Sequence, residues 1–227
     1  MGDSIHRTCK ILTIAIAFLL LCSVASAATL NVGSNQKYKT IQSAVNAAHN
    51  GDTIKVSSGT YPEIVEINKS ISIYGTNYPK VDGFSYDWGP SYKGGTVNGF
   101  TILNHIYAKE FGIIIRNNYF TESSLNVIGP GDGDGITIMN NQFPKGYLWL
   151  SFTDKNVTIT GNTISNTDYG LYCEHVEDFP IVTKNTFQNC GCAVYLDGFN
   201  KDPGRLSTFS GNKYIKNKQN IGWGNNN

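Results

Sequence analysis

The sequence Gly135-Ile136-Thr137-Ile138-Met139-Asn140-Asn141-Gln142-Phe143 holds one copy of a pattern that recurs along the chain. In this pattern an Asn is followed two residues later by an apolar residue, as in Asn141 and Phe143. Other copies occur at Asn98/Phe100, Asn118/Phe120, Asn162/Ile164, Asn185/Phe187 and Asn212/Tyr214. Successive Asn of the pattern are 20, 23, 21, 23 and 27 residues apart. A β-rich unit that recurs at roughly this interval is typical of a solenoid, in which each repeat forms one coil.

Counting from the repeated Asn also aligns apolar positions, which we expect to stack inside the solenoid with one coil every ~4.8 Å. These positions are three residues before the Asn (Ile115, Ile138, Ile159, Val182 and Phe209), two after it (Phe120, Phe143, Ile164, Phe187 and Tyr214), nine after it (Val127, Leu150, Leu171 and Val194) and eleven after it (Gly129, Phe152, Cys173 and Leu196). The Asn themselves are predicted to lie at a turn, because Asn tolerates left-handed backbone angles and stacked amides hydrogen-bond from coil to coil.

The N-terminal 27 residues have the composition of a signal peptide. Arg7 and Lys10 lie before an apolar run of 11 residues, Ile11 to Leu21, which is short for a membrane span. Ala25-Ser26-Ala27 forms an A-x-A cleavage site, so residues 28–227 are predicted to form the mature chain and a single domain. No later run resembles a transmembrane segment. The protein is therefore predicted to be secreted or extracellular, or held at the cell surface.

The charge of the mature chain argues against nucleic acid as a partner. Removing Asp3, Arg7 and Lys10 from the 18 basic and 17 acidic residues leaves 16 of each, and hence no net charge. Binding to phosphate backbones requires a basic field. The abundance of Gly, Asn, Thr, Ser, Ile and Val instead indicates a chain of short strands and many turns.

The first part of the mature chain is predicted to contain the single helix. Residues 40–49 place apolar side chains at helical spacing, with Thr40 as the N-cap. A short amphipathic helix is a suitable cap for the end of a solenoid, which would otherwise expose its core. Three strands are predicted next, at residues 52–56, 63–67 and 70–74. Residues 77–95 are rich in Gly and Pro, and we predict a loop that interrupts the repeat.

This opening resembles a known superfamily. The segments are similar to the opening of right-handed parallel β-helix proteins, and they are Lys39–Ala48, Gly51–Val56, Gly59–Glu63, Ile67–Ile73 and Gly75. The superfamily includes pectin methylesterases, pectate lyases and periplasmic copper-accessory proteins. The resemblance implies an all-β, right-handed parallel β-helix with one short N-terminal capping helix. It does not imply an activity, because one fold supports many functions.

The catalytic motifs of these enzymes are missing from the sequence or incomplete. The Gln-Asp pair and the Asp-Phe-Ile-Phe-Gly strand of pectin methylesterases do not occur, nor do the four motifs of polygalacturonases. Pectate lyases use an Arg base beside carboxylates that bind Ca²⁺. Arg116, Asp132 and Asp134 supply these residue types, although Arg116 has the pattern of a solvent-facing strand residue. His49, His105 and His175 lack the spacing of metal ligands, so the copper-accessory resemblance concerns the fold only.

Cys173, Cys190 and Cys192 remain after removal of the signal peptide. Counting from the repeated Asn places Cys173 and Cys192 on neighbouring inward-facing strands but four residues apart along them, which is roughly 13 Å. This separation is too large for a disulfide. A Cys190–Cys192 bond would close a short, strained ring. We therefore predict three free thiols.

The outward positions contain the best candidate site. Tyr172 is predicted to stack over Tyr195 and Glu174 over Asp197, with Trp149 near them on the same face. Aromatic faces bind the apolar surfaces of sugars, and carboxylates accept hydrogen bonds from sugar hydroxyls. This arrangement predicts a glycan-binding face. The alternative is that these are ordinary strand residues with β preference. Glu174 and Asp197 on adjacent coils would also have the spacing of a retaining glycosidase pair.

Two further patterns suggest ligands or modification. Asp132 and Asp134 lie in a Gly-Asp-Gly-Asp-Gly segment that resembles part of a Ca²⁺ loop, but two carboxylates are few for an ion that takes six to eight oxygens. A polar turn is the simpler interpretation, and no other cofactor is predicted. Asn68 and Asn156 begin glycosylation sequons, which matter only if the source organism glycosylates exported proteins.

Taken together, these patterns favour a non-catalytic, secreted or cell-surface β-helix module that binds polysaccharide or cell-envelope glycan or has a structural role in the envelope. The first alternative is a polysaccharide-active enzyme, either a lyase or a glycoside hydrolase. The second is a metal-accessory protein of the periplasmic copper type. No capping element is recognisable after Ile221 and Trp223, and an uncapped end would invite end-to-end self-association.

Overall fold

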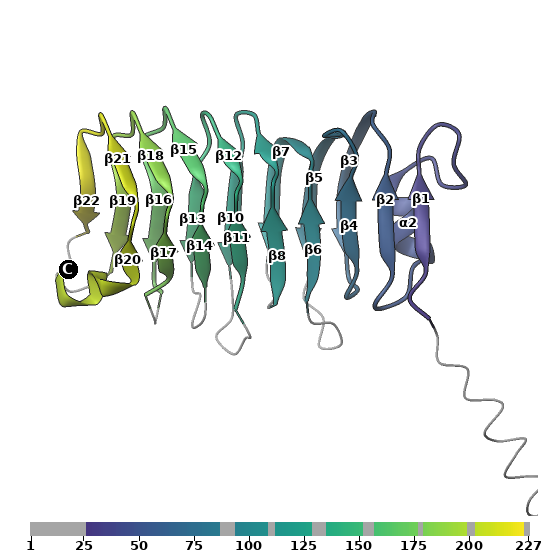
Figure 1. Ribbon diagram of the computed structural model, residues 1–227, viewed down its shortest axis with the longest axis horizontal. Coiled ribbons are helices and arrows are strands. Elements are labelled where there is room, and N and C mark those ends of the chain that lie inside the picture. Colours follow the sequence, from purple (N-terminus) through teal and green to yellow (C-terminus); the bar gives the residue numbers. More distant parts are fainter. Residues whose placement is uncertain are drawn as a thin grey trace, which may run out of the picture.

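The computed structural model describes residues 26–86, 94–108, 112–128, 135–151, 157–176, 179–198 and 203–224. These residues form a solenoid of parallel strands whose coils follow one another along the long axis of the molecule (Figure 1). Each coil contributes strands to two sheets that enclose the apolar core between them. The predicted all-β solenoid with parallel strands is confirmed.

The first sheet is regular along its whole length, with nine strands in parallel register. Its strands, in spatial order, are β1 (Thr29–Val32), β2 (Thr53–Val56), β4 (Ser72–Gly75), β6 (Gly95–Asn98), β8 (Ile113–Arg116), β11 (Thr137–Met139), β14 (Thr158–Thr160), β17 (Ile181–Thr183) and β20 (Phe209–Ser210). A 3-10 helix, η1 (Pro203–Thr208), leads into β20.

The second sheet changes its form along the axis. It begins with the long strands β3 (Thr60–Ile67), β5 (Lys80–Tyr86) and β7 (Thr101–Ala108). The first part of β7 then pairs with β9 and its second part with β10, so the sheet divides into two arms. One arm contains β9 (Tyr119–Phe120), β12 (Gln142–Phe143), β15 (Thr163–Ser165), β18 (Thr186–Gln188) and β21 (Lys213–Ile215); the other contains β10 (Ser124–Ile128), β13 (Leu148–Ser151), β16 (Tyr169–Glu174), β19 (Cys192–Asp197) and β22 (Gln219–Trp223).

The helix α2 (Ile41–Ala47) packs at the N-terminal end of the solenoid, beside β1, β2 and β3 (Figure 1). The Thr40 side chain accepts a hydrogen bond from the backbone N–H of Ser43, as the N-cap prediction required. Charged side chains hold both ends of the helix. Glu63 accepts hydrogen bonds from the first two helical N–H groups, and the Lys69 ammonium donates to three carbonyls at the other end. The helix ends earlier than predicted because Ala48 is already extended.

The apolar positions aligned by the repeated Asn are inside. Every described member of these columns is buried except Phe209 and Tyr214, which are half-buried in the last coil. Gly129 and Phe152 lie outside the described residues. One alignment was wrong by two residues: Leu150 pairs with Cys173 and not with Leu171. The reason is that the turn segment from Ile164 to Leu171, before and into β16, is two residues longer than the segment from Phe143 to Leu148 with which it pairs.

The Asn ladder is real, but its place in the backbone differs from the prediction. The side-chain oxygen of each Asn accepts from the backbone N–H of the Asn one coil earlier, at 2.9 Å from Asn118 to Asn141 and from Asn141 to Asn162. Each side-chain NH₂ group donates to a carbonyl of the preceding coil, as Asn162 does to Ile138. The ladder consists of Asn118, Asn141, Asn162, Asn185 and Asn212.

The left-handed residue of each turn directly precedes the ladder Asn, so the prediction that the ladder Asn themselves take this conformation is wrong. Asn117 and Asn140 have φ values of 53° and 55°. Asn98 was also assigned incorrectly, since it pairs with Arg116 in the first sheet. The position that corresponds to the ladder in that coil is Phe100, whose N–H donates to Asn118. The ladder therefore begins at Asn118.

The predicted loop at residues 77–95 is wrong in part, because β5 passes through it. Val81, Phe84 and Tyr86 are buried, so this strand carries a full share of the core. The register of β5 against β7 shifts between Val81 and Gly83, within the segment predicted as a loop. A Cβ at Gly83 would be 2.1 Å from the carbonyl oxygen of His105, so glycine is required for close approach of the strands.

Cys173, Cys190 and Cys192 are buried and free, as predicted. Cys173 pairs with Leu196 while Cys192 pairs with Tyr169, which gives the four-residue offset that the sequence indicated. Asn68 is exposed, and Asn156 lies outside the described residues. Within the described part of the chain no helix is long and apolar enough to cross a membrane.

Candidate functional site

The parallel register of β13, β16 and β19 brings aromatic side chains into one outward-facing column. Trp149 pairs with Tyr172, and Tyr172 pairs with Tyr195. The same register forms a polar column beside it, in which Ser151 pairs with Glu174 and Glu174 with Asp197. Trp149 is thus directly next to Tyr172, closer than the sequence count suggested, because that count did not include the longer turn before β16.

Three tyrosines form a packed cluster on this face. The rings of Tyr172 and Tyr195 are stacked, with centroids 5.3 Å apart and planes 18° apart. Tyr169 meets both of them edge-on, with centroid distances of 5.4 Å to Tyr172 and 5.1 Å to Tyr195. Pairs in these geometries are mutually attractive, so the cluster is a preorganised aromatic surface.

The two carboxylates of the polar column have different partners. Glu174 accepts a hydrogen bond from the Ser151 hydroxyl at 2.9 Å. Asp197 accepts one from the Tyr172 hydroxyl at 2.8 Å. The backbone of Gly224 lies against Asp197 on its other side, where an added Cβ would be 2.0 Å from a carboxylate oxygen. Asp197 is therefore a support for Tyr172, whereas Glu174 borders open space.

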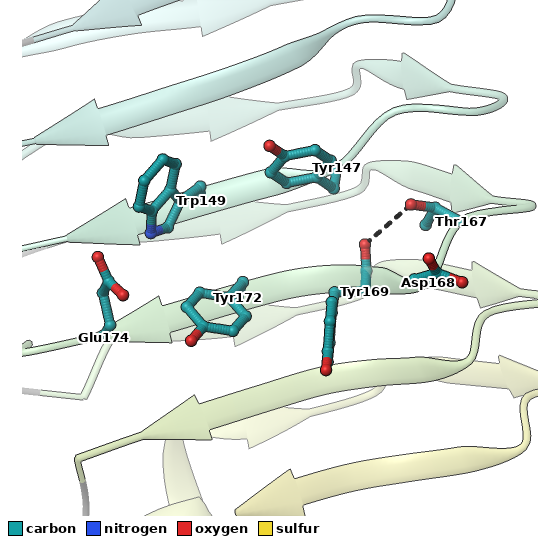
Figure 2. Close-up of a pocket in the computed structure, with 7 residues that line it drawn as sticks. All are labelled: Tyr147, Trp149, Thr167, Asp168, Tyr169, Tyr172 and Glu174. Carbon is teal, nitrogen blue, oxygen red and sulfur yellow. Dashed lines mark hydrogen bonds between the residues drawn. The ribbon is translucent and has the colours of Figure 1, made fainter. Parts of the chain in front are cut away.

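An open groove of about 410 Å³ runs along this face. Figure 2 shows Tyr147 and Trp149 on one side, Tyr169 and Tyr172 on the other, and Glu174 at one end. Tyr147 and Tyr169 expose 37% and 41% of their surface. The complete lining is Tyr147, Trp149, Thr167, Asp168, Tyr169, Tyr172 and Glu174.

Of the five residues predicted from the sequence, Trp149, Tyr172 and Glu174 line the groove. Tyr195 and Asp197 do not line it, but both contact Tyr172 from the next coil. Four lining residues were missed: Tyr147, Thr167, Asp168 and Tyr169.

The missed residues have identifiable signals. Tyr147 lies two residues before Trp149 and so shares its strand face. Thr167 and Asp168 belong to the longer turn, which lies along the edge of the groove (Figure 2). Tyr169 was missed because counting from the repeated Asn gives it the same position as its register partner Cys192, which was predicted to face inward. The alternation of buried and exposed residues breaks at Gly170 and Leu171, which are both buried, and this irregularity leaves Tyr169 exposed.

Two phenols of the cluster, those of Tyr172 and Tyr195, have raised pKa values. Burial is the main cause that raises the pKa of Tyr172, and the hydrogen bond to Asp197 adds to the effect. Burial also raises the pKa of Tyr195, with a further contribution from the Asp197 charge. At neutral pH the Tyr172 hydroxyl is therefore a proton donor to Asp197, and it is not a candidate base.

A second, polar groove of about 510 Å³ lies beyond the longer turn. Thr167 and Asp168 line both grooves, so this turn separates them. The side chains that distinguish the second groove are those of Lys145, Lys216 and Lys218. Lys145 is paired with Glu122, whose carboxylate accepts a hydrogen bond from the Lys145 ammonium group.

The residues proposed for metal or lyase chemistry are described only in part. Asp132 and Asp134 lie outside the described residues. Arg116 is in β8 of the first sheet, away from the aromatic column on the second. In the described part of the chain, no group of three or more His, Cys, Asp and Glu residues has a geometry that could hold a metal ion.

Comparison with known proteins identifies the architecture. Residues 89–227, more than half of the 227-residue chain, match the family model described as a right handed beta helix region. No curated protein and no solved structure has a significant match to the chain.

Proposed function

The chain belongs to the right-handed β-helix family, and we propose that on this scaffold it is a secreted or cell-surface module that binds glycan through the aromatic groove and catalyses no reaction. The observation that carries the proposal is the groove itself. Four aromatic side chains and two carboxylates line it, and strand register fixes the positions of Trp149, Tyr172 and Glu174.

The chemistry of the groove suits a sugar chain. The π faces of Trp149, Tyr147 and Tyr169 attract the C–H surfaces of sugar rings. Glu174 at the end of the groove offers a carboxylate oxygen for hydroxyl groups, since Ser151 contacts only one of its two oxygens. The stacked cluster of Tyr169, Tyr172 and Tyr195 is already ordered, so binding has a small conformational entropy cost.

The spacing of the carboxylates favours binding over hydrolysis. Only Glu174 and Asp168 line the groove as carboxylates, and they lie at opposite ends of it (Figure 2). Six residues of extended chain separate them, which is roughly 20 Å between Cα atoms. Glycosidase pairs work at about 5 to 10 Å. Asp197, the register partner of Glu174, accepts the hydrogen bond of the Tyr172 hydroxyl and does not line the groove.

A glycan array tests the proposal. The wild-type protein should retain one class of polysaccharide or cell-envelope glycan, and Tyr169→Ala or Trp149→Ala should reduce that binding at least about tenfold, the loss of roughly one good aromatic contact. Tyr119→Ala is the matched control, because Tyr119 is a tyrosine of similar exposure, 38%, on β9 outside the groove. Equal binding by all three variants would rule out the groove as the site.

Product release separates a binding module from the enzyme alternative. Incubation with polygalacturonate and other uronans, with and without Ca²⁺, should release no oligosaccharide or unsaturated product. Release that depends on Glu174 would identify a hydrolase, and release that depends on Ca²⁺ and Arg116 would identify a lyase. The copper-accessory alternative has no comparable support among the described residues.

A further inference from the structure

Asp52 is a buried carboxylate at the start of the solenoid, and it contacts the first residue of the predicted mature chain. Its side chain is 5% exposed. One carboxylate oxygen accepts a hydrogen bond from the Ala28 backbone N–H at 2.7 Å, and the other accepts from the His49 N–H at 2.8 Å. The Ala28 carbonyl in turn accepts from Thr53 at 2.8 Å. Both backbone groups of Ala28 are therefore fixed next to this carboxylate.

Asp52 has no close cationic partner among the described residues. The nearest ring nitrogen of His49 is 3.9 Å away, and the His49 side chain is 90% exposed. Lys69 acts on Asp52 only at a distance, because its ammonium group donates to the carbonyls of Val45, Asn46 and Ala48. Hydrogen bonds from His49 and Ala28 are the main causes that lower the pKa of Asp52. A buried carboxylate held in this way stays charged and would be stabilised by a cation.

The bond before Ala28 is placed for cleavage. Ser26, Ala27 and Ala28 are exposed and lie outside any strand, and β1 begins at Thr29. The segment Ala25-Ser26-Ala27 has the small-residue pattern of an export cleavage site. Hydrolysis between Ala27 and Ala28 would therefore remove no residue of the first sheet.

We propose that export processing at Ala27–Ala28 creates an α-ammonium group on Ala28 that forms a salt bridge with the buried carboxylate of Asp52. A peptidase of the export machinery hydrolyses the peptide bond with one water. Ala27 leaves with the new carboxylate, and Ala28 keeps the amine, which takes up a proton. The amide hydrogen bond of the precursor thus becomes a charge-assisted one at the same position. The inference rests on the export part of the proposed function and is independent of glycan binding.

The new pair has a defined pH dependence. An α-amino group has an ordinary pKa near 8, and a neighbouring carboxylate raises that pKa in the folded protein. Stability from the ammonium group is fully present below about pH 8 and is lost as pH rises through the raised value. The lowered pKa of Asp52 acts in the opposite range. The stability that the charged Asp52 side chain contributes is present above the ordinary carboxyl pKa and is lost as pH falls through the lowered pKa.

The first test is the N-terminus of the full chain after expression in an exporting host. Mass spectrometry should find a chain that begins at Ala28. The second test compares proteins that begin at Ala28 with proteins that begin at Ala27, each with Asp52 or with Asp52→Asn. With Asp52, the Ala28 start should lower the unfolding equilibrium constant about tenfold at pH 7, the usual gain of a hydrogen bond between charged groups over a neutral one.

The outcomes are distinct. The advantage of the Ala28 start should disappear with Asp52→Asn and should fade above pH 8 as the amine titrates. A mature N-terminus at another residue overturns the proposed processing. The proposed salt bridge is overturned if the Ala28 start is no more stable than the Ala27 start when Asp52 is present. It is also overturned if the Ala28 start keeps its advantage with Asp52→Asn. Glycan binding should be equal in all four proteins, so a failure of the glycan proposal is detected separately.

Discussion

The two ends of the solenoid reach the same parallel architecture by different means. In the N-terminal coils the second sheet has long, continuous strands, and charged side chains such as Glu63 and Lys69 fix a helix over the end. In the C-terminal coils each long strand is replaced by two short ones, and the Asn ladder runs between coils. The ladder begins at Asn118, in the first coil where two strands, β9 and β10, replace the continuous strand β7.

This coincidence has a physical reason. Strands such as β9 and β12 have two residues each, so they contribute few backbone hydrogen bonds between coils. A buried ladder Asn supplies several more: Asn141 donates to Asn162 through its backbone and side chain and to Ile115 through its side chain. Division of the strand also creates the extra turn whose length sets the aromatic groove. Hydrogen bonds between the C-terminal coils therefore come partly from Asn side chains, whereas those between the N-terminal coils of the second sheet come mainly from the backbone.

The largest effect is expected from breaking the ladder. Asn162→Ala removes the acceptor for two Asn141 donors and leaves the Ile138 carbonyl without its side-chain partner. Buried groups left unsatisfied cost about 1–3 kcal/mol each, so we expect a loss of about 3 kcal/mol or more in the free energy of unfolding. Urea denaturation followed by circular dichroism measures this loss.

Asn98→Ala is the control for the ladder. Asn98 is a half-buried Asn of the first sheet whose side-chain oxygen accepts a hydrogen bond from the Asn117 side chain at 2.7 Å, and it lies outside the ladder. Its loss should cost about 1 kcal/mol or less. Similar losses for Asn98→Ala and Asn162→Ala would contradict the special role of the ladder in the C-terminal coils.

The next effect concerns the N-terminal cap. Lys69→Met keeps the aliphatic chain but removes the ammonium group that donates to three carbonyls at the end of α2. We expect a loss of about 1–2 kcal/mol in the free energy of unfolding. Lys55→Met, at an exposed position of β2, should be neutral within about 0.5 kcal/mol. A neutral Lys69→Met would show that the helix is held by apolar packing alone.

A smaller effect is expected at the groove. Tyr172→Phe removes the hydrogen bond to Asp197 but keeps the stacked ring, so stability should fall by about 1 kcal/mol at pH 7. The raised pKa of the wild-type Tyr172 phenol means that its contribution is present below about pH 10 and is lost as pH rises through the folded value. The wild type and Tyr172→Phe should therefore converge in stability at alkaline pH. Tyr119→Phe, the matched control, should follow the wild type throughout.

The sequence predicted the repeat well because a solenoid core is built from local periodicity. Ile115, Ile138 and Ile159 recur at nearly constant spacing and are all buried. The groove was predicted less completely, since it depends on a two-residue difference in turn length and on the break in alternation near Gly170. Neither feature changes which residue types occur at the repeated positions of the sequence. The division of the second sheet was not predicted at all, because short strands and one long strand have the same alternation.

The smallest effect is expected at Cys190, one of the cysteines that, among the described residues, occur only in the C-terminal coils. Burial raises the pKa of Cys173, and it raises that of Cys190 to about 11. A thiol-specific reagent at pH 8 should therefore react slowly with the native protein, since the thiolate is the reactive form. After denaturation, a chain that begins at Ala28 should react with three equivalents of the reagent. Cys190→Ser should leave stability within about 1 kcal/mol of wild type, whereas Cys173→Ser buries a hydroxyl in an apolar column and should cost more. Recovery of a single thiol would reveal a disulfide and contradict the offset between Cys173 and Cys192.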